Sequence, residues 1–297
     1  MRDRHFFEMT RHSSRRRFVV GTLTLMGGGC RKTSPPSAAR ALTEIEQSVG
    51  GRLGVCAVDT ESGRELVHRA DELFAMCSTF KWVLAAAVLG RVQSRVLLLQ
   101  QKLAFGQADL LEYAPVARQR VADGFMTVEA LLQAAITVSD NTAANLLLRE
   151  IGGPTGLTQF IRANGDTVTR LDRNEPLLNV NAPEDPRDTT SPRAMARLML
   201  HLLCGQSLSQ EHRQLLLGWM RACETGKRRL RAGFPADWDI GDKTGSGLRN
   251  AVNDVAIAVP PGRAPILVAA YTSGGTATMD ATQAALARVA SLVAREL

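Results

Sequence analysis

Ser78 and Lys81 are the first residues of this sequence whose types and spacing suggest chemistry. They open the stretch AMCSTFKWVLAAAVLG (75–90), in which nearly every residue after Lys81 is apolar. Residues three positions apart lie on one face of an α-helix, with about 5–6 Å between their Cβ atoms. An ammonium group among apolar side chains is costly unless it has a partner or a function. A serine N-cap and a lysine that reaches the surface would explain the pair without any chemistry.

Three further polar clusters follow along the chain. Ser-Asp-Asn occupies 139–141 before an apolar helical pattern, and Lys-Thr-Gly occupies 243–245 at the end of a strand-like run. Glu175 and Asn179 lie in an irregular stretch over 166–190, and so long a loop in a compact domain suggests a function. Taken singly, the clusters are compatible with a helix N-cap, a strand end and a surface loop. Their joint occurrence with the serine–lysine pair favours nucleophilic catalysis by serine.

Hydrophobic periodicity and turn signals place strands near both ends of the chain and helices between them. The predicted strands cover 51–60, 64–70, 238–245, 253–261 and 264–275, and the predicted helices cover 81–90, 127–137, 142–151, 155–163, 192–203 and 279–295. We therefore predict an α/β (α+β) fold, in which one antiparallel sheet is built from both ends of the chain. An α/β lobe would comprise 41–72 and 217–297, and an all-helical lobe, 73–216, would be inserted between these segments.

The net charge of +7 is concentrated at the N-terminus. Residues 1–32 contain eight basic and two acidic side chains, which leaves +1 for residues 33–297. The rest of the chain shows no basic stripe interleaved with aromatic residues, which argues against nucleic acid as a partner. The proportions of hydrophobic residues (45%) and charged residues (22%) in the full sequence are those of an ordinary globular protein.

Residues 1–40 have the features of an export signal followed by a linker. Paired arginines in SRRRF precede the apolar stretch Phe18–Met26, which is too short to span a bilayer. The pattern resembles a twin-arginine export signal. Two processing sites remain open, because Cys30 could be a lipoprotein acceptor that carries a lipid anchor, whereas ordinary cleavage could occur near 37–39. Either site predicts a periplasmic protein.

The cysteines and histidines do not form a metal-binding motif. The sequence has no C-x-x-C pair and no H-E-x-x-H spacing, so we expect no metal and no other cofactor. Apart from Cys30, the thiols are those of Cys56, Cys77, Cys204 and Cys223. They could form disulfides in an oxidising compartment or remain as buried free thiols, and we favour buried free thiols.

Together the clusters resemble the motifs of class A β-lactamases, which are S-x-x-K, S-D-N and K-T-G. Here these motifs are Ser78–Lys81, 139–141 and 243–245, and the loop pair Glu175 and Asn179 resembles class A enzymes specifically. The similarity extends from about residue 41 to the C-terminus and includes CSTFK, AAITVSDNTAANLLL, RDTTSP and GDKTGSG. The leader, MCSTFK and GGPTGLTQF are similar to exported enzymes of non-fermenting Gram-negative bacteria. The resemblance implies a β-lactamase/transpeptidase-like fold with a five-stranded antiparallel sheet, and a catalytic domain over 41–297.

The resemblance also implies roles for the catalytic residues. Ser78 would be the nucleophile, at a helix N-terminus that favours developing negative charge. Lys81 would take or relay its proton, and Ser139 would pass a proton to the departing nitrogen. Glu175 and Asn179 would hold the hydrolytic water. Whether Lys81 or Glu175 is the base in acylation stays open.

A substrate-binding set follows from the same resemblance: Asn141, Asn179, Lys243, Thr244, Ser246, Arg229 and Tyr113. Asn141 would bind the amide of the substrate's side chain, and the lysine motif with Ser246 would bind its carboxylate. Arg229 is preferred to Arg231 as a further arginine at this seat. The backbone N–H groups of Ser78 and Ser246 would form the oxyanion hole.

Two disulfides that the resemblance leads us to expect are missing here. Cys77 precedes the nucleophile as in carbapenem-hydrolysing relatives, but Gly247 occupies the position of its partner. Ala85 and Leu132 occupy the positions of the disulfide within the helical lobe. We therefore expect good turnover of penicillins and cephalosporins, weak turnover of carbapenems, and inactivation by clavulanate-type inhibitors.

The sequence thus predicts an exported, monomeric serine β-lactamase that confers resistance to β-lactam antibiotics. A penicillin-binding transpeptidase or DD-peptidase would share the three motifs, and a sensor domain that is acylated and signals is a second alternative. Glu175 and Asn179 distinguish the β-lactamase, since that pair serves attack by water. Arg173 and Asp188 are expected to pair across the base of their loop, although an ordinary surface pair is the alternative.

Overall fold

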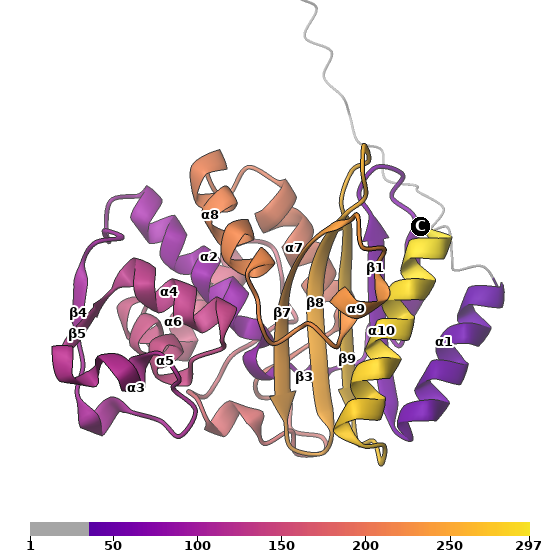
Figure 1. Cartoon of the computed structure of the whole chain (residues 1–297), viewed down its shortest axis with the longest axis horizontal. Helices are drawn as coiled ribbons and strands as arrows, with labels where there is room; N and C mark the ends of the chain where they lie inside the picture. Colours follow the sequence, from indigo (N-terminus) through magenta and orange to yellow (C-terminus); the bar gives the residue numbers. More distant parts are fainter. Residues whose placement is uncertain (1–35) are drawn as a thin grey trace, which may run out of the picture. The chain divides into compact units, whose positions relative to one another are not determined.

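The computed structural model describes residues 36–297, which contain a five-stranded antiparallel sheet (Figure 1). The strand order across this sheet is β2-β1-β9-β8-β7. The bounds are Arg52–Asp59 for β1, Glu65–His68 for β2, Asp239–Gly247 for β7, Ala251–Val259 for β8 and Ile266–Ser273 for β9. Strands from the two ends of the chain meet where β1 pairs with β9 along its whole length. The predicted sheet, built from both ends of the chain, is confirmed.

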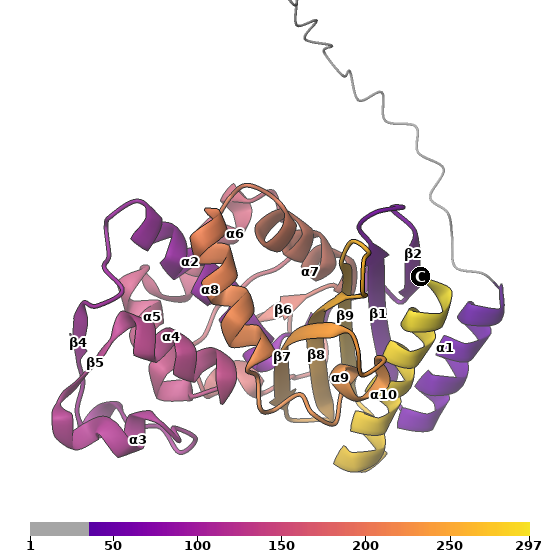
Figure 2. The ribbon, with the colours of Figure 1, turned by 45° about the horizontal axis from the view of Figure 1, so that its top comes forward.

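One face of the sheet is covered by helices α1 (Pro36–Val49), α9 (Leu230–Gly233) and α10 (Met279–Glu296), which lie side by side in Figures 1 and 2. Helix α1 begins before the predicted boundary at residue 41. Its Leu42 and Val49 share one helix face and are fully buried against the sheet. This amphipathic segment therefore belongs to the fold and not to the linker.

The other face of the sheet packs against the helical part of the chain. Helix α7 (Pro192–Met199) contacts β1 and β9, and helix α8 (Gln210–Arg221) contacts β7. Because helices cover both faces, β8 is buried over all but its last residue and β9 over its whole length. Their apolar residues therefore form nearly continuous runs instead of alternating with polar ones.

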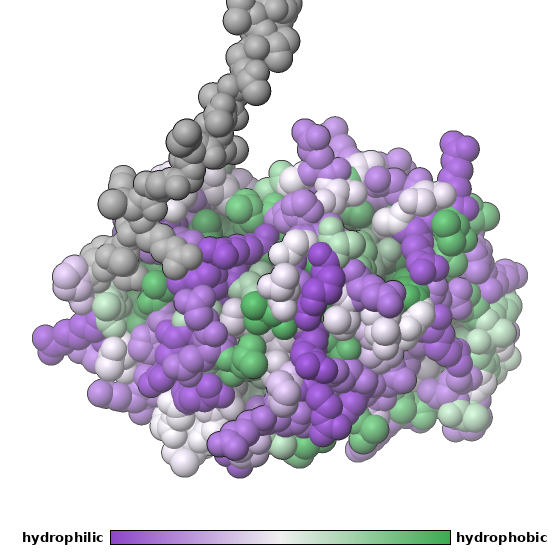
Figure 3. All heavy atoms as spheres, turned by 180° about the vertical axis from the view of Figure 1, so that it is seen from behind, coloured by the Kyte–Doolittle hydropathy of each residue, from purple (hydrophilic) through white to green (hydrophobic). Residues whose placement is uncertain are grey.

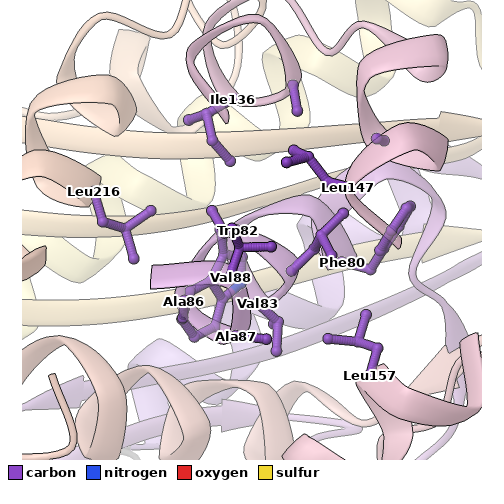
Figure 4. Packing of buried hydrophobic residues seen from close by; sticks show 14 of the residues in the cluster. Phe80, Trp82, Val83, Ala86, Ala87, Val88, Ile136, Leu147, Leu157 and Leu216 are labelled. Atoms are coloured by element: carbon purple, nitrogen blue, oxygen red, sulfur yellow. The ribbon is translucent and has the colours of Figure 1, made fainter. Parts of the chain in front are cut away.

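Helix α2 (Phe80–Gln93) is the central element of the helical lobe. Its first ten residues are all buried, including Lys81. Around it lie α4 (Val128–Thr137), α5 (Asn141–Glu150), α6 (Gly153–Ala163) and α8. Figure 4 shows the packing, with side chains of α2 among Ile136, Leu147, Leu157 and Leu216 of those four helices. The polar residues at the start of α2 are thereby held at the border between the helical lobe and the sheet.

The remaining elements are short. They are β3 (Phe74–Ala75), β4 (Lys102–Ala104), β5 (Phe125–Thr127), β6 (Thr189–Thr190), helix α3 (Ala117–Arg120), the π-helical turn η5 (Leu200–Cys204), and the 3-10 turns η1 (Cys77–Thr79), η2 (Gln107–Asp109), η3 (Val121–Asp123) and η4 (Leu177–Asn179). Strand β3 pairs with β6, which anchors the end of the long loop beside the segment that leads to Ser78.

The surface is mixed in polarity on the face seen in Figure 3, where hydrophobic residues lie in small groups among hydrophilic ones. Among the described helices, none combines the length and the apolar composition that crossing a bilayer requires.

Candidate active site

Ser78 lies in the turn η1, directly before helix α2, and is buried apart from 9% of its surface. Its hydroxyl donates a hydrogen bond to Glu175 Oε1 at 3.0 Å, and the N-cap of α2 is Thr79. Strand β7 runs close to this turn, since a Cβ on Gly245 would lie 2.7 Å from Met76 O and 3.1 Å from Ser78 N. Only glycine permits this approach, which brings the end of β7 beside the backbone N–H of the serine.

Lys81 is fully buried one turn after Ser78, which excludes a lysine that reaches the surface. Its Nζ lies 3.0 Å from Glu175 Oε1 and donates to Asn141 Oδ1 (2.6 Å) and to the carbonyl oxygen of Ser139 (2.8 Å). Burial lowers the pKa of this lysine, and the Glu175 charge opposes that effect. The ammonium is therefore well bonded but more readily deprotonated than a surface lysine.

Glu175 is the group that joins the long loop to the helical lobe. One carboxylate oxygen contacts both Ser78 Oγ and Lys81 Nζ, and the other accepts a hydrogen bond from Asn179 Nδ2 at 2.6 Å. The residue is 97% buried, so its carboxylate belongs to the interior and is not a group of a surface loop. A water molecule that binds between this carboxylate and the serine could lose its proton to Glu175.

Asn145 fixes the backbone of Glu175 and was not identified from the sequence. Its Oδ1 accepts from the Glu175 N–H at 3.0 Å, and its Nδ2 donates to the Glu175 carbonyl at 2.9 Å. Asn145 follows Asn141 by one helical turn on α5, so its position on the same helix face was a signal that could have found it.

Ser139 lies between the two buried lysines. Its Oγ accepts from Lys81 Nζ at 3.3 Å and from Lys243 Nζ at 3.1 Å. The residue has φ +61, and Asp140 holds this turn by capping α5 and accepting from the N–H groups of Val116 and Ala117. A hydroxyl between two ammonium groups is well placed to pass on a proton.

Arg229, the N-cap residue of α9, reaches the end of β7 with its side chain. Its Nη2 donates to Ser246 Oγ at 2.7 Å, and its Nη1 donates to the carbonyl oxygens of Gly245 and Asn253. Arg231 instead pairs with Asp242, so Arg229 is the arginine that reaches the lysine motif. Burial lowers the pKa of Arg229, but a guanidinium remains charged at physiological pH.

Lys243 and Thr244 complete the polar end of β7. Lys243 is fully buried, and burial lowers its pKa to about 8. The Thr244 hydroxyl lies 2.6 Å from the hydroxyl of Thr225. Together with Ser246, whose side chain is exposed, these groups offer a positively charged, hydroxyl-lined surface that suits a carboxylate.

Tyr113 and Asn141 lie at the mouth of this cluster. Tyr113 is 51% exposed, and its hydroxyl donates a hydrogen bond to the carbonyl oxygen of Val138 at 3.1 Å. The backbone of Tyr113 accepts a hydrogen bond from the Asn141 N–H. The structure therefore gathers every residue of the predicted catalytic and binding sets at the junction of the two lobes.

The pair Arg173–Asp188 is confirmed, with Arg173 Nε 2.5 Å from Asp188 Oδ2. Asp188 is fully buried and also accepts from the N–H groups of Asp172 and Arg173. These contacts close the base of the loop that carries Glu175.

All four cysteines of residues 36–297 are free, and only Cys204 is exposed. The thiol of Cys77 faces Gly247, where a Cβ would lie 2.6 Å from its Sγ. Cys56, Cys77 and Cys223 are free and buried as expected, whereas the expectation of burial is wrong for Cys204; burial raises the pKa of Cys77 to about 12. Within the described part of the chain no three His, Cys, Asp or Glu side chains are grouped as metal ligands would be.

A nucleophilic serine, a buried lysine and a loop carboxylate in mutual contact, on a sheet with an inserted helical lobe, define a serine enzyme of acyl transfer. The family model of the β-lactamase enzyme family matches residues 37–297. The chain belongs to this family, and within it to class A. The predicted family and fold are confirmed.

The similar proteins span nearly the whole chain. The carbapenem-hydrolysing β-lactamase KPC of Klebsiella oxytoca is 45% identical over 86% of this chain and 87% of its own length. The β-lactamase CTX-M-8 of Citrobacter amalonaticus is 40% identical over 96% of this chain and 99% of its own. The solved structure of an ancestral class A β-lactamase, GNCA, has a TM-score of 0.86 and 52% identity, covering 88% of this chain and all of that one.

Proposed function

We propose that this protein hydrolyses the β-lactam amide bond of penicillins and cephalosporins through an acyl-enzyme on Ser78, and so confers resistance to these antibiotics. The observation that carries the proposal is the position of Glu175 Oε1, 3.0 Å from both Ser78 Oγ and Lys81 Nζ. A base that touches the nucleophile and its lysine can serve the attack of water on an ester formed at that serine.

In the acylation step, Ser78 Oγ attacks the β-lactam carbonyl carbon and loses its proton to the lysine–glutamate cluster. Lys81 can take this proton in its neutral form, which its lowered pKa makes more accessible, and Glu175 can take it directly, since the Ser78 hydroxyl donates to its Oε1. The backbone N–H groups of Ser78 and Ser246 would stabilise the oxyanion. The C–N bond then breaks, and Ser139, held between Lys81 and Lys243, gives its proton to the nitrogen and takes one from Lys81 in its place.

In the deacylation step, Glu175 and Asn179 would hold and deprotonate the water that attacks the ester. This step separates a β-lactamase from a penicillin-binding peptidase or an acylated sensor. Purified protein should turn over a chromogenic cephalosporin steadily, at a rate that a chelator does not change. A single stoichiometric burst without further turnover would refute the proposal in favour of one of those classes.

Asn145 is expected to support deacylation by positioning Glu175. In Asn145→Ala, the N–H and C=O of Glu175 lose their partners, which should lower the free energy of unfolding by about 1–3 kcal/mol. Rapid-mixing kinetics should show that deacylation slows more than acylation does. Asn164→Ala is the matched control, because that half-buried amide bonds to the Phe160 carbonyl, outside the site. Equal effects of the two variants on deacylation would contradict the positioning role.

Lys243 is expected to make substrate binding dependent on pH. Its pKa of about 8 means that the ammonium loses its charge as the pH rises through that value, which weakens attraction to the substrate carboxylate. The KM for a penicillin should therefore rise on the alkaline side of the profile. Lys243→Arg keeps the charge and should remove the alkaline rise, even if the overall KM changes. A wild-type KM that stays constant through this range would contradict the assignment.

Carbapenem turnover is expected to be weak, because Gly247 provides no disulfide partner for Cys77. A kinetic panel of penicillins, cephalosporins and a carbapenem tests this expectation. Carbapenem rates equal to penicillin rates would contradict it and show that the disulfide at Cys77 is not required for carbapenem turnover. Inactivation by a clavulanate-type inhibitor is expected in the same panel.

We infer further that the protein is exported to the periplasm by the twin-arginine route and acts there as a monomer. The arginine pair and Cys30, the candidate lipid-anchor site, lie outside the described residues. Mass analysis of the mature N-terminus distinguishes cleavage near 37–39, which would remove the first residues of α1, from lipidation of Cys30.

A further inference from the structure

Asp242 and Asp254 are two buried carboxyl groups behind the proposed carboxylate seat. They lie on adjacent strands, where Asp254 of β8 pairs with Thr244 of β7 and Asp242 precedes Thr244 by two residues. Side chains two residues apart on a strand share a face, so both carboxyl groups lie on the side of the sheet that Arg229 occupies. Both residues are fully buried.

Each carboxyl group has one oxygen that is bonded and one that is not. Asp242 Oδ1 accepts from Arg231, and Asp254 Oδ2 accepts from the Leu230 N–H at 3.1 Å. Asp242 Oδ2 and Asp254 Oδ1 have no hydrogen-bond partner within residues 36–297. The backbone of Gly226 closes over Asp242 Oδ2, since a Cβ there would lie 1.8 Å from it.

Two ionised carboxylates in this position would repel each other and leave two buried acceptors unpaired. A proton on one of the two groups removes the repulsion and spares the protein a second buried negative charge. Asp242 keeps its charge more readily, since Arg231 pairs with it, whereas Asp254 has only a backbone N–H. The proton is therefore expected on Asp254.

We propose that Asp254 is a positioning residue that stays protonated beside the ionised Asp242 and thereby leaves the Arg229 charge free for the substrate carboxylate. The inference rests on the proposed function of the carboxylate seat. All the hydrogen bonds of Arg229 in the described chain go to neutral acceptors, namely two carbonyl oxygens and the Ser246 hydroxyl. An ionised Asp254 would offset this guanidinium from behind.

The surroundings of Asp254 support a neutral acid. Burial raises its pKa well above the ordinary value, and the negative charge of Asp242 raises it further, whereas Arg229 acts in the opposite direction. The titratable and charged groups that face the pair are Lys243 on β7, Cys223 after α8, Arg229 and Arg231 at α9, and Tyr271 on β9. None of these groups supplies a direct ion pair to Asp254 among residues 36–297.

Infrared spectroscopy of the purified protein tests the proton directly, without any β-lactam. The spectrum of the wild type at neutral pH should contain the C=O stretch of a buried carboxylic acid, and this band should be absent from Asp254→Asn. The matched control is Asp239→Asn, which removes an exposed carboxylate of the neighbouring strand β7 that pairs with Arg221, and this variant should keep the band. A wild-type spectrum without the band would overturn the proposal even if the Asp254 variant failed to fold.

The pH dependence of stability gives a second readout. A carboxyl group whose pKa is raised by folding stabilises the protein fully below its ordinary pKa, and this contribution is lost as the pH rises through the folded-state value. Asp254→Asn should therefore make urea stability fall less steeply with rising pH than in the wild type. An unchanged slope would contradict the proposal.

Two boronic acids test the link to the carboxylate seat. Both bond to Ser78, but one carries a carboxylate in the position of the substrate's and the other does not. If Asp254 is neutral, Asp254→Asn changes no charge, and the ratio of the two inhibition constants should stay the same. If Asp254 is ionised, the variant should bind the carboxylate-bearing compound several-fold more tightly relative to the other, which would overturn the proposal. Failure of β-lactam turnover would affect neither spectroscopy nor unfolding, so the two proposals fail separately.

Discussion

Glu175→Ala is expected to form a stable acyl-enzyme on Ser78 and to lose nearly all turnover. Loss of a general base typically costs about 10²–10⁴-fold, and here the base also positions the water. Acylation should persist, because Lys81 keeps its bonds to Asn141 and to the carbonyl of Ser139, and the oxyanion hole is made of backbone. Intact mass after mixing with a penicillin should show one penicilloyl group per chain, which remains after the free drug is removed.

Two controls define this result. Ser78→Ala should give no adduct, and Glu184→Ala, which alters an exposed glutamate of the same loop, should turn over as the wild type does. Normal turnover by Glu175→Ala would make the buried carboxylate purely structural. The proposed role of Glu175 in deacylation, which distinguishes class A enzymes from the peptidases, would then be wrong.

The local part of the site could be predicted from the sequence because helix geometry is periodic. Ser78 and Lys81 are one turn apart, so their shared face follows from the spacing alone. The contact of Ser78 with Glu175 joins residues 97 positions apart, and no local rule predicts it. That part of the site was available only through the resemblance to class A enzymes.

What the sequence did not reveal depends on tertiary packing. Helix α1 has a regular apolar face, but its first residues directly follow the predicted export signal, so the sequence predicts a linker there. Asn145 shares a helix face with Asn141, but its bonds to Glu175 depend on how the long loop packs beside that helix. Asp242 and Asp254 read as polar residues of two ordinary strands, and only their burial and strand register bring them onto one face of the sheet.

Lys81→Met is expected to slow acylation by about 10²–10⁴-fold, the usual cost of a lost general base. Methionine is unbranched and flexible, so it should fit the fully buried site with little repacking. Glu175 would lose its cationic partner but would still accept from Ser78 and from Asn179. Rapid mixing with a chromogenic cephalosporin should show that the burst is slow. Lys102→Met is the control, because that lysine is exposed on β4.

The same variant addresses which residue is the base in acylation. If Lys81 takes the Ser78 proton directly, Lys81→Met acylates slowly whereas Glu175→Ala acylates and then stalls. If Glu175 acts through a water, the pattern reverses, and Lys81→Met forms the acyl-enzyme at nearly the wild-type rate. The Ser78 hydroxyl donates to Glu175 Oε1, and Lys81 Nζ lies 3.0 Å from the same oxygen, so the geometry is compatible with either base and the two variants decide between them. Rapid acylation by Lys81→Met would assign the role to Glu175.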